Sequence, residues 1–232
     1  MIVGAVFIPS SPLLLADVDV EGLLDDVRAA SIELLSEFLP DARQIIAIGS
    51  ADETAWFDEG GIGTSKGLGG HADFSIGAGT ATLPLALTIA AFVLEAAGAD
   101  QPILALSVGK QTTSTERGLI AQEVQARAAD VPTVLLVVGD GSATRTEKAP
   151  GYIQPDALNF DAVVSAALAA ADFQTLVEIT QEQAERLWCQ GLPAWQVAAL
   201  AGQHLKQGEL ALETAPFGVN YLVASWRPWQ KP

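Results

Sequence analysis

The stretch VPTVLLVVGDGSA (131–143) constrains the fold of this chain more than any other feature. Its Val and Leu residues run on without polar alternation, which is typical of a strand buried on both faces, as in a parallel sheet. The run stops at Gly139, and small polar residues follow. The sequence therefore predicts a central strand whose carboxyl end opens into a polar loop.

Apolar runs and helical patterns alternate along the rest of the chain. Further strands are expected at 2–8, 43–50, 102–108, 210–215 and 218–226. Helices are expected at 21–39, 85–97, 115–129, 157–170, 174–189 and 193–207. This order predicts an α/β fold, a three-layer α/β/α arrangement with a largely parallel or mixed central sheet. Because there is no repeat or linker-like composition, residues 1–232 are expected to form a single domain.

Residues 51–82 are rich in glycine and show no clear periodicity, so they are expected to be irregular. Within them, residues 58–73 contain GGIGTSKGLGG and few apolar side chains that could bury surface against a sheet. This segment is predicted to be mobile, or to form a lid over a cleft.

The charge balance excludes some classes of partner. The formal net charge is −16, and no basic stripe occurs, so neither nucleic acid nor an anionic membrane surface is expected as a partner. Residues 74–94 are uncharged, but glycines, threonines and Pro84 interrupt them, which favours a buried helix over a membrane span. A single cysteine and an N-terminus unlike a signal peptide predict a cytoplasmic protein.

The residues that could bind a ligand or take part in a reaction lie at the ends of the predicted strands. Ligands of open α/β sheets bind beyond the carboxyl ends of the strands, which here are PSSP, GSADE, SVGKQ and GDGSA. We therefore expect Ser10, Ser50, Asp52, Lys110 and Asp140 to surround a common pocket.

Serines at these ends allow one hypothesis, a metal-free hydrolase. Ser10 and Ser11 lie between two prolines, which stiffen the loop, and Ser142 lies in GDGSA. A serine nucleophile needs an adjacent base, for which the chain offers only two histidines, His71 and His204. The simpler interpretation is that the serines cap backbone groups in a turn.

Carboxylates at the same ends allow a second hypothesis, a metal site. Asp52, Glu53 and Asp140 could hold a hard cation, and His71 could join them if its glycine-rich segment folded back. Short acidic residues after strands also cap turns and helices, and that is the simpler interpretation.

Tryptophans are concentrated in the last third of the chain. Aromatic residues grouped in this way are typical of a domain edge or of a contact between subunits, so a homo-oligomer is one expectation. The four residues are Trp188, Trp195, Trp226 and Trp229.

Several stretches together resemble a known family. FIPSSPLLL resembles the first loop of class III extradiol ring-cleavage dioxygenases of the B-subunit type, where a strand runs into Pro-His-Pro-Pro-Leu-Leu. VVGDGSATRTEKAPGY resembles the family's central strand and its Gly-Asp-x-Ser-His loop. NFDAVVSAALAAADFQTL, GLPAWQV and TAPFGVNYLVASW resemble its later helices and closing hairpin, in the same order. The resemblance spans nearly the whole chain and is closest to small, single-domain actinobacterial members.

The resemblance implies an Fe(II) site of two histidines and one carboxylate, with open positions for a catechol and dioxygen. This chain departs from that pattern. The first-loop histidine falls on Ser10, and the second falls within 50–53, where there is none. The carboxylate falls on Gln196, which is therefore expected as a sixth residue of the pocket. The histidine of the Gly-Asp-x-Ser-His loop falls on Ala143. The two serines of PSSP thus occupy the place of a metal ligand.

The expected function is therefore that of a non-catalytic relative that binds a small aromatic molecule or a partner, with no cofactor. The alternative is an active metal-dependent oxidoreductase on catechol-type substrates, with Fe(II) held by relocated ligands drawn from Asp52, Glu53, His71 and Asp140.

Overall fold

A seven-stranded mixed sheet forms the centre of the computed structural model, which describes residues 1–229. Its order is β3-β7-β2-β8-β1-β10-β9. The middle strands are parallel: β7 (Ile103–Gly109), β2 (Gln44–Ala51), β8 (Thr133–Val138) and β1 (Ile2–Ile8). The outer strands pair antiparallel: β3 (Ala55–Phe57) with β7, β10 (Tyr221–Pro228) with β1, and β9 (Leu205–Thr214) with β10.

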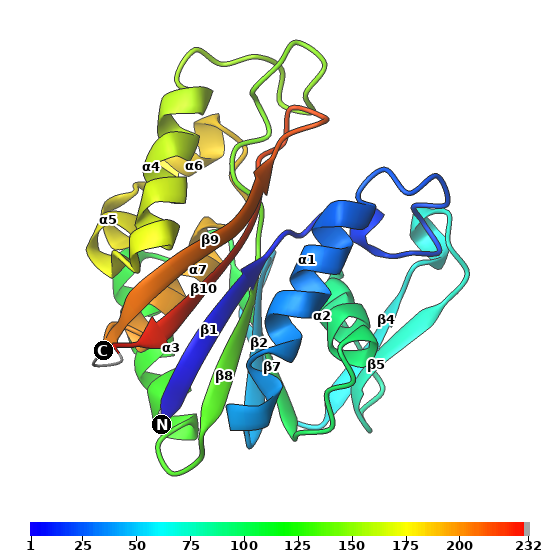
Figure 1. Ribbon diagram of the computed structural model, residues 1–232, viewed down its shortest axis with the longest axis vertical. Coiled ribbons are helices and arrows are strands. Elements are labelled where there is room, and N and C mark those ends of the chain that lie inside the picture. The colour runs from blue at the N-terminus through cyan, green and yellow to red at the C-terminus, as the bar shows by residue number, and fades with distance from the viewer. Residues whose placement is uncertain (230–232) are drawn as a thin grey trace.

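Helices cover both faces of this sheet (Figure 1). One face carries α1 (Asp25–Ser36) and α2 (Leu85–Ala96). The other carries α3 (Ser114–Arg127), α4 (Ala157–Ala170), α5 (Phe173–Glu178), α6 (Gln181–Arg186) and α7 (Leu192–Ala201). Successive strand residues point to opposite faces, so in β8 Leu135 packs in one core and Leu136 in the other. The predicted α/β class and the buried central strand are confirmed.

The predicted helix 21–39 is shorter in the structure, where α1 spans Asp25–Ser36, and two other predicted helices differ more. The predicted helix 174–189 is divided, because the Thr180 hydroxyl accepts a hydrogen bond from the Gln183 N–H at 3.2 Å and caps α6. The predicted helix 193–207 ends at Ala201, and β9 begins at Leu205. His204 therefore lies in the turn between them, with its Nε2 2.8 Å from the Ile2 carbonyl oxygen.

The expectation of an irregular segment at 51–82 was wrong. Besides β3, this part forms a second sheet, whose strands in order are β5 (Asp73–Gly77), β4 (Gly60–Thr64) and β6 (Ala81–Thr82). β4 and β5 are paired along their whole length, and no residue of 58–73 lines the main pocket, so the lid prediction was wrong as well. The glycines allow close packing: a Cβ on Gly63 would lie 2.1 Å from the Thr88 hydroxyl oxygen on α2.

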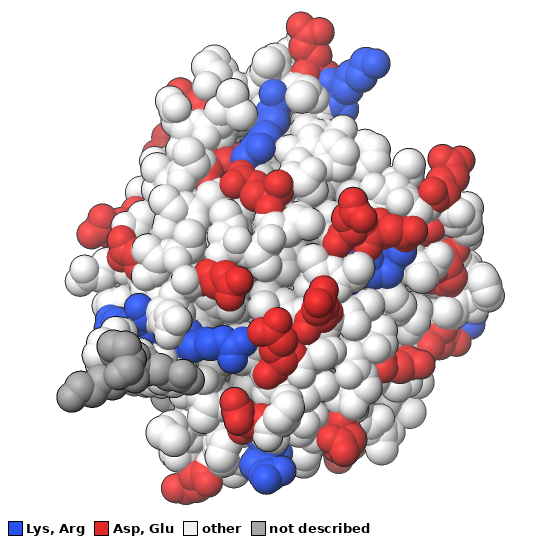
Figure 2. Space-filling view, viewed as in Figure 1, with Lys and Arg blue, Asp and Glu red and all other residues white. Residues whose placement is uncertain are grey.

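Short 3₁₀ turns complete the described chain: η1 (Pro12–Leu14), η2 (Leu39–Asp41) and η3 (Lys66–Leu68). None of its helices is both long and apolar enough to cross a membrane. Acidic side chains are spread over the face shown in Figure 2, among few basic ones. Trp195 and Trp226 are buried in the core, whereas Trp188 and Trp229 are exposed, and a homo-oligomer stays a prediction.

Candidate functional site

A pocket of about 520 Å³ lies beyond the carboxyl ends of β1, β2, β7 and β8. This is the edge where ligands of open α/β sheets bind. Five of the six residues expected around a pocket line it: Ser10, Ser50, Asp52, Lys110 and Asp140.

The floor of the pocket is built around Asp140. β1 and β8 are adjacent and parallel, with Ile8 opposite Val138, so the residues that follow each strand meet. The Ser10 N–H donates to one Asp140 carboxylate oxygen at 2.7 Å, and the Ser10 hydroxyl donates to the other at 2.8 Å. Burial raises the pKa of Asp140 to about 6, against the opposing effect of these two hydrogen bonds. Asp140 therefore changes its charge close to neutral pH.

A second polar group lies beside this carboxylate. The buried Ser11 accepts a hydrogen bond from the Leu13 N–H at 3.4 Å, which caps η1, and Tyr221 lines the same pocket. Burial raises the pKa of Tyr221, so its hydroxyl stays protonated at neutral pH. Serine, tyrosine and aspartate oxygens together give the floor both donors and acceptors.

Apolar side chains form the walls. They come from η1, the start of α2, the 144–156 loop, the turn after α6 and the loop before β10: Pro12, Pro84, Leu85, Pro150, Trp188 and Val219. The first turn of α2 approaches β2 closely, since a Cβ on Gly49 would lie 2.6 Å from that of Ala86. Trp188 adopts a positive φ of 55° and remains half exposed beside the pocket.

The rim carries an ion pair. The Lys110 ammonium lies 3.1 Å from the Asp52 carboxylate, and both side chains are exposed. Ser50 has a structural contact as well: its hydroxyl accepts a hydrogen bond from the Ala194 N–H at 3.3 Å, in the uncapped first turn of α7.

Two candidate residues lie away from the pocket. The prediction for Gln196 was wrong: it is buried under α3, where its Oε1 accepts a bond from Arg117 at 2.6 Å. Its amide donates to three carbonyl oxygens in and after α5. Ser142 is fully buried, and its N–H and hydroxyl donate to Asp161 at 2.9 and 2.5 Å. Both residues stabilise the packing of helices and loops, and neither faces the pocket.

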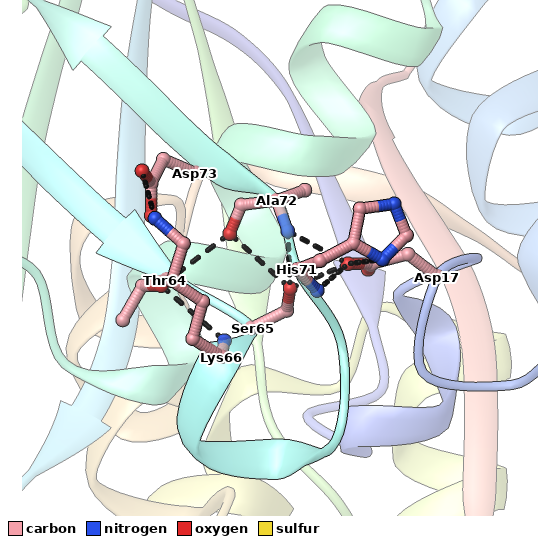
Figure 3. A network of polar contacts seen from close by, with 7 residues as sticks. All are labelled: Asp17, Thr64, Ser65, Lys66, His71, Ala72 and Asp73. Atoms are coloured by element: carbon pink, nitrogen blue, oxygen red, sulfur yellow. Dashed lines mark hydrogen bonds and ion pairs between the residues drawn. The ribbon is translucent and has the colours of Figure 1, made fainter.

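His71 belongs to a different part of the molecule (Figure 3). It lies in the turn between β4 and β5, beside Asp17. One Asp17 oxygen accepts bonds from the Ser65 hydroxyl at 2.5 Å and from the N–H groups of His71 and Ala72 at 2.7 and 2.9 Å. These bonds help to hold the pKa of Asp17 below its usual range, although burial opposes them. The network ties the loop after η1 to the second sheet.

The donor set at the pocket does not fit the iron site that the resemblance implies. Fe(II) sites of this kind use two imidazoles and one carboxylate. Here a carboxylate, that of Asp140, stands beside hydroxyl groups, and neither His71 nor His204 lines the pocket. Glu53 is exposed and does not line it either. Within residues 1–229, no three His, Cys, Asp or Glu side chains are grouped as metal ligands.

Sequence reasoning missed several residues of the pocket, among them Tyr221 and Trp188. Tyr221 opens the last strand, and its position follows only from the antiparallel pairing of β10 with β1. Trp188 was noted only as one of a group of aromatic residues. Its role in the wall depends on the turn after α6, where the sequence WCQG has no pattern that predicts it.

The overall fold has a counterpart among solved structures. No family model and no curated protein matches the chain. The structure is similar to the crystal structure of an uncharacterized protein from Escherichia coli K12, with a TM-score of 0.52 and 16% sequence identity. The similarity covers 97% of this chain and 99% of that one. At this identity the likeness concerns the fold alone.

Proposed function

We propose that this protein binds a small aromatic molecule in the pocket at the carboxyl ends of its parallel strands. It would be a non-catalytic relative of the class III extradiol dioxygenases, with Ser10 in the place of an iron ligand. The observation that carries the proposal is the composition of the pocket. A floor of hydroxyl and carboxyl groups is enclosed by proline, leucine, valine and tryptophan side chains.

The dimensions support a ligand of this kind. Sites for small organic molecules commonly enclose roughly 300–1,000 Å³ and combine apolar walls with a few polar groups. The pocket holds about 520 Å³. The indole of Trp188 offers a flat surface against which a ring can stack, while Ser10, Ser11 and Tyr221 can exchange hydrogen bonds with a ring hydroxyl.

The binding experiment uses ¹⁵N-labelled protein titrated with catechol and with 2-phenylethanol. The amide signals that shift should cluster around Ser10, Asp140 and Tyr221. Replacing the wall residue, Trp188→Ala, should weaken binding about tenfold or more, a loss of roughly 1.4 kcal/mol that is typical of an aromatic contact. The matched control Trp229→Ala removes an exposed indole that does not line the pocket and should leave the affinity unchanged.

Scattered signal shifts, or no binding of either probe at millimolar concentration, would contradict the proposal. The metal-dependent alternative is tested separately. The protein is loaded anaerobically with Fe(II), and oxygen uptake is followed with protocatechuate-like catechols. We expect no uptake, because neutral hydroxyls and two carboxylates, of which Asp52 is paired with Lys110, hold Fe(II) poorly without imidazole ligands. Turnover that is lost in His71→Ala would favour relocated ligands instead.

A further inference from the structure

Asp140 is a carboxylate that faces a cavity without a positive partner. Its two oxygens receive hydrogen bonds from the Ser10 N–H and hydroxyl, which are both neutral. Among residues 1–229, no Lys, Arg or His forms an ion pair with it. A charge in such a place is costly unless a partner compensates it, and each oxygen retains a lone pair that can accept another bond.

The remaining charges of the pocket do not compensate it. Lys110 is already paired with Asp52 at the rim, so these two cancel. With Asp140 ionised, the residues that line the pocket carry a formal charge of −1, from two aspartates and one lysine. The protein as a whole carries −16, which adds to the negative potential.

The amino end of α2 acts in the opposite direction. Leu85 and Ala86 line the pocket, and Pro84 provides no side-chain cap for their N–H groups. A helix amino end is equivalent to about half a positive charge, and its effect is limited to the first turn. Against the full charge of Asp140 this is the smaller effect, so a negative potential prevails at the floor.

We propose that the pocket selects an organic cation, a small aromatic molecule that carries a primary or secondary ammonium group. This inference rests on the proposed function and narrows its ligand class. The ammonium group donates to the free lone pairs of Asp140, and the body lies against the apolar walls. The exposed indole of Trp188, which lines the same pocket, can favour a cation further.

The test compares three probes of similar shape on the unmodified protein: 2-phenylethylammonium, 2-phenylethanol and phenylacetate. Dissociation constants are measured at pH 7.5 by NMR titration. We expect the ammonium to bind about tenfold more tightly than the alcohol, in line with a charge-assisted hydrogen bond, and the carboxylate to bind most weakly.

The variant Asp140→Asn locates the effect. Its affinity for the ammonium should fall about tenfold or more, while its affinity for the alcohol should stay within about threefold. Asp156→Asn is the matched control, because it makes the same change of net charge at an exposed ion pair with Arg186, away from the pocket. It should leave all three affinities in the same order.

Two results would overturn this inference while leaving the proposed function intact. One is tighter binding of phenylacetate than of the ammonium, which would mean that Lys110 and the amino end of α2 dominate. The other is equal binding of ammonium and alcohol. If none of the three probes binds, the proposed function itself fails. Since the probe comparison needs no substitution, the inference remains testable even if Asp140→Asn does not fold.

Discussion

Asp140 and Asp161 accept the same pattern of hydrogen bonds from a serine, but they lie in different surroundings. In each case one serine donates both its backbone N–H and its hydroxyl to the two oxygens of the carboxylate. Ser10 does this for Asp140 at 2.7 and 2.8 Å, and Ser142 does it for Asp161 at 2.9 and 2.5 Å. The two serines follow neighbouring parallel strands, β1 and β8.

The difference lies in the third partner. The Arg145 guanidinium lies 2.7 Å from Asp161, which is fully buried, and it also contacts Glu213. Within residues 1–229 no such cation pairs with Asp140, which lines the pocket. A buried carboxylate with its counter-ion serves the fold, whereas one that is clamped only by neutral donors is available to a ligand. The contrast favours Asp140, rather than Asp161, as the carboxylate of the proposed binding site.

The largest effect should come from making the two sites alike, by removing the cation. Arg145→Ala leaves Asp161 buried and uncompensated, and should lower the free energy of unfolding by roughly 3–5 kcal/mol. Urea denaturation at pH 7 measures it. The control Arg186→Ala breaks an exposed pair with Asp156 and should change the value by less than about 1 kcal/mol. Equal small losses in both variants would mean that Arg145 does not compensate Asp161.

The next effect concerns pH. The pKa of Asp140 is about 6 in the folded protein, above its ordinary value of 3.8, so the folded state holds the proton more tightly than the unfolded chain. Its contribution to stability is present below pH 4 and is lost as the pH rises through 6, by about 3 kcal/mol. The Asp140→Asn variant has no such group.

Unfolding free energies at pH 4, 5, 6 and 7 test this point. The stability of Asp140→Asn relative to the original protein should increase across that window and then level off. Parallel pH profiles of the two proteins would show that Asp140 is not the group responsible. The same substitution is expected to weaken ammonium binding, so the two measurements examine one side chain independently.

Removing either serine hydroxyl should lower the free energy of unfolding by a smaller amount, and the two losses can be compared directly. Ser142→Ala removes a bond in a dry interior and should cost roughly 1.5–3 kcal/mol, as for hydrogen bonds to charged groups. Ser10→Ala should cost less, about 0.5–1.5 kcal/mol, because water in the pocket can take the position of the hydroxyl. Both variants are compared by urea denaturation. A larger loss for Ser10→Ala would contradict the view that its site is open.

The smallest effect is expected at the rim. Lys110→Ala breaks an ion pair whose two side chains are exposed, and the unfolding free energy should change by less than about 1 kcal/mol. The ammonium probe should bind somewhat more tightly, since the positive charge nearest the pocket entrance is gone. NMR titration measures this affinity. Weaker binding of the ammonium probe would contradict the inference that the pocket favours a positive charge.

The sequence was informative wherever one local pattern decides the structure. The unbroken run in β8 could only be a strand covered on both faces, and strand ends of a parallel sheet meet at one edge. These two rules were enough to predict that Ser10, Asp52, Lys110 and Asp140 lie around one pocket. The sequence was misleading for β4 and β5, whose glycines suggested mobility. In the structure Gly63 packs so closely against Thr88 that a side chain would not fit, and this contact between distant residues cannot be read from the sequence.

The sequence by itself determined the α/β class and the acidic surface. Tertiary structure alone decided which buried carboxylate receives a cation. Arg145 and Asp161 are 16 residues apart, yet they meet through packing of the 144–156 loop on α4, and Tyr221 reaches the pocket through strand pairing. Charge compensation depends on distances of a few ångströms, and such distances between separate elements are set by packing rather than by local sequence.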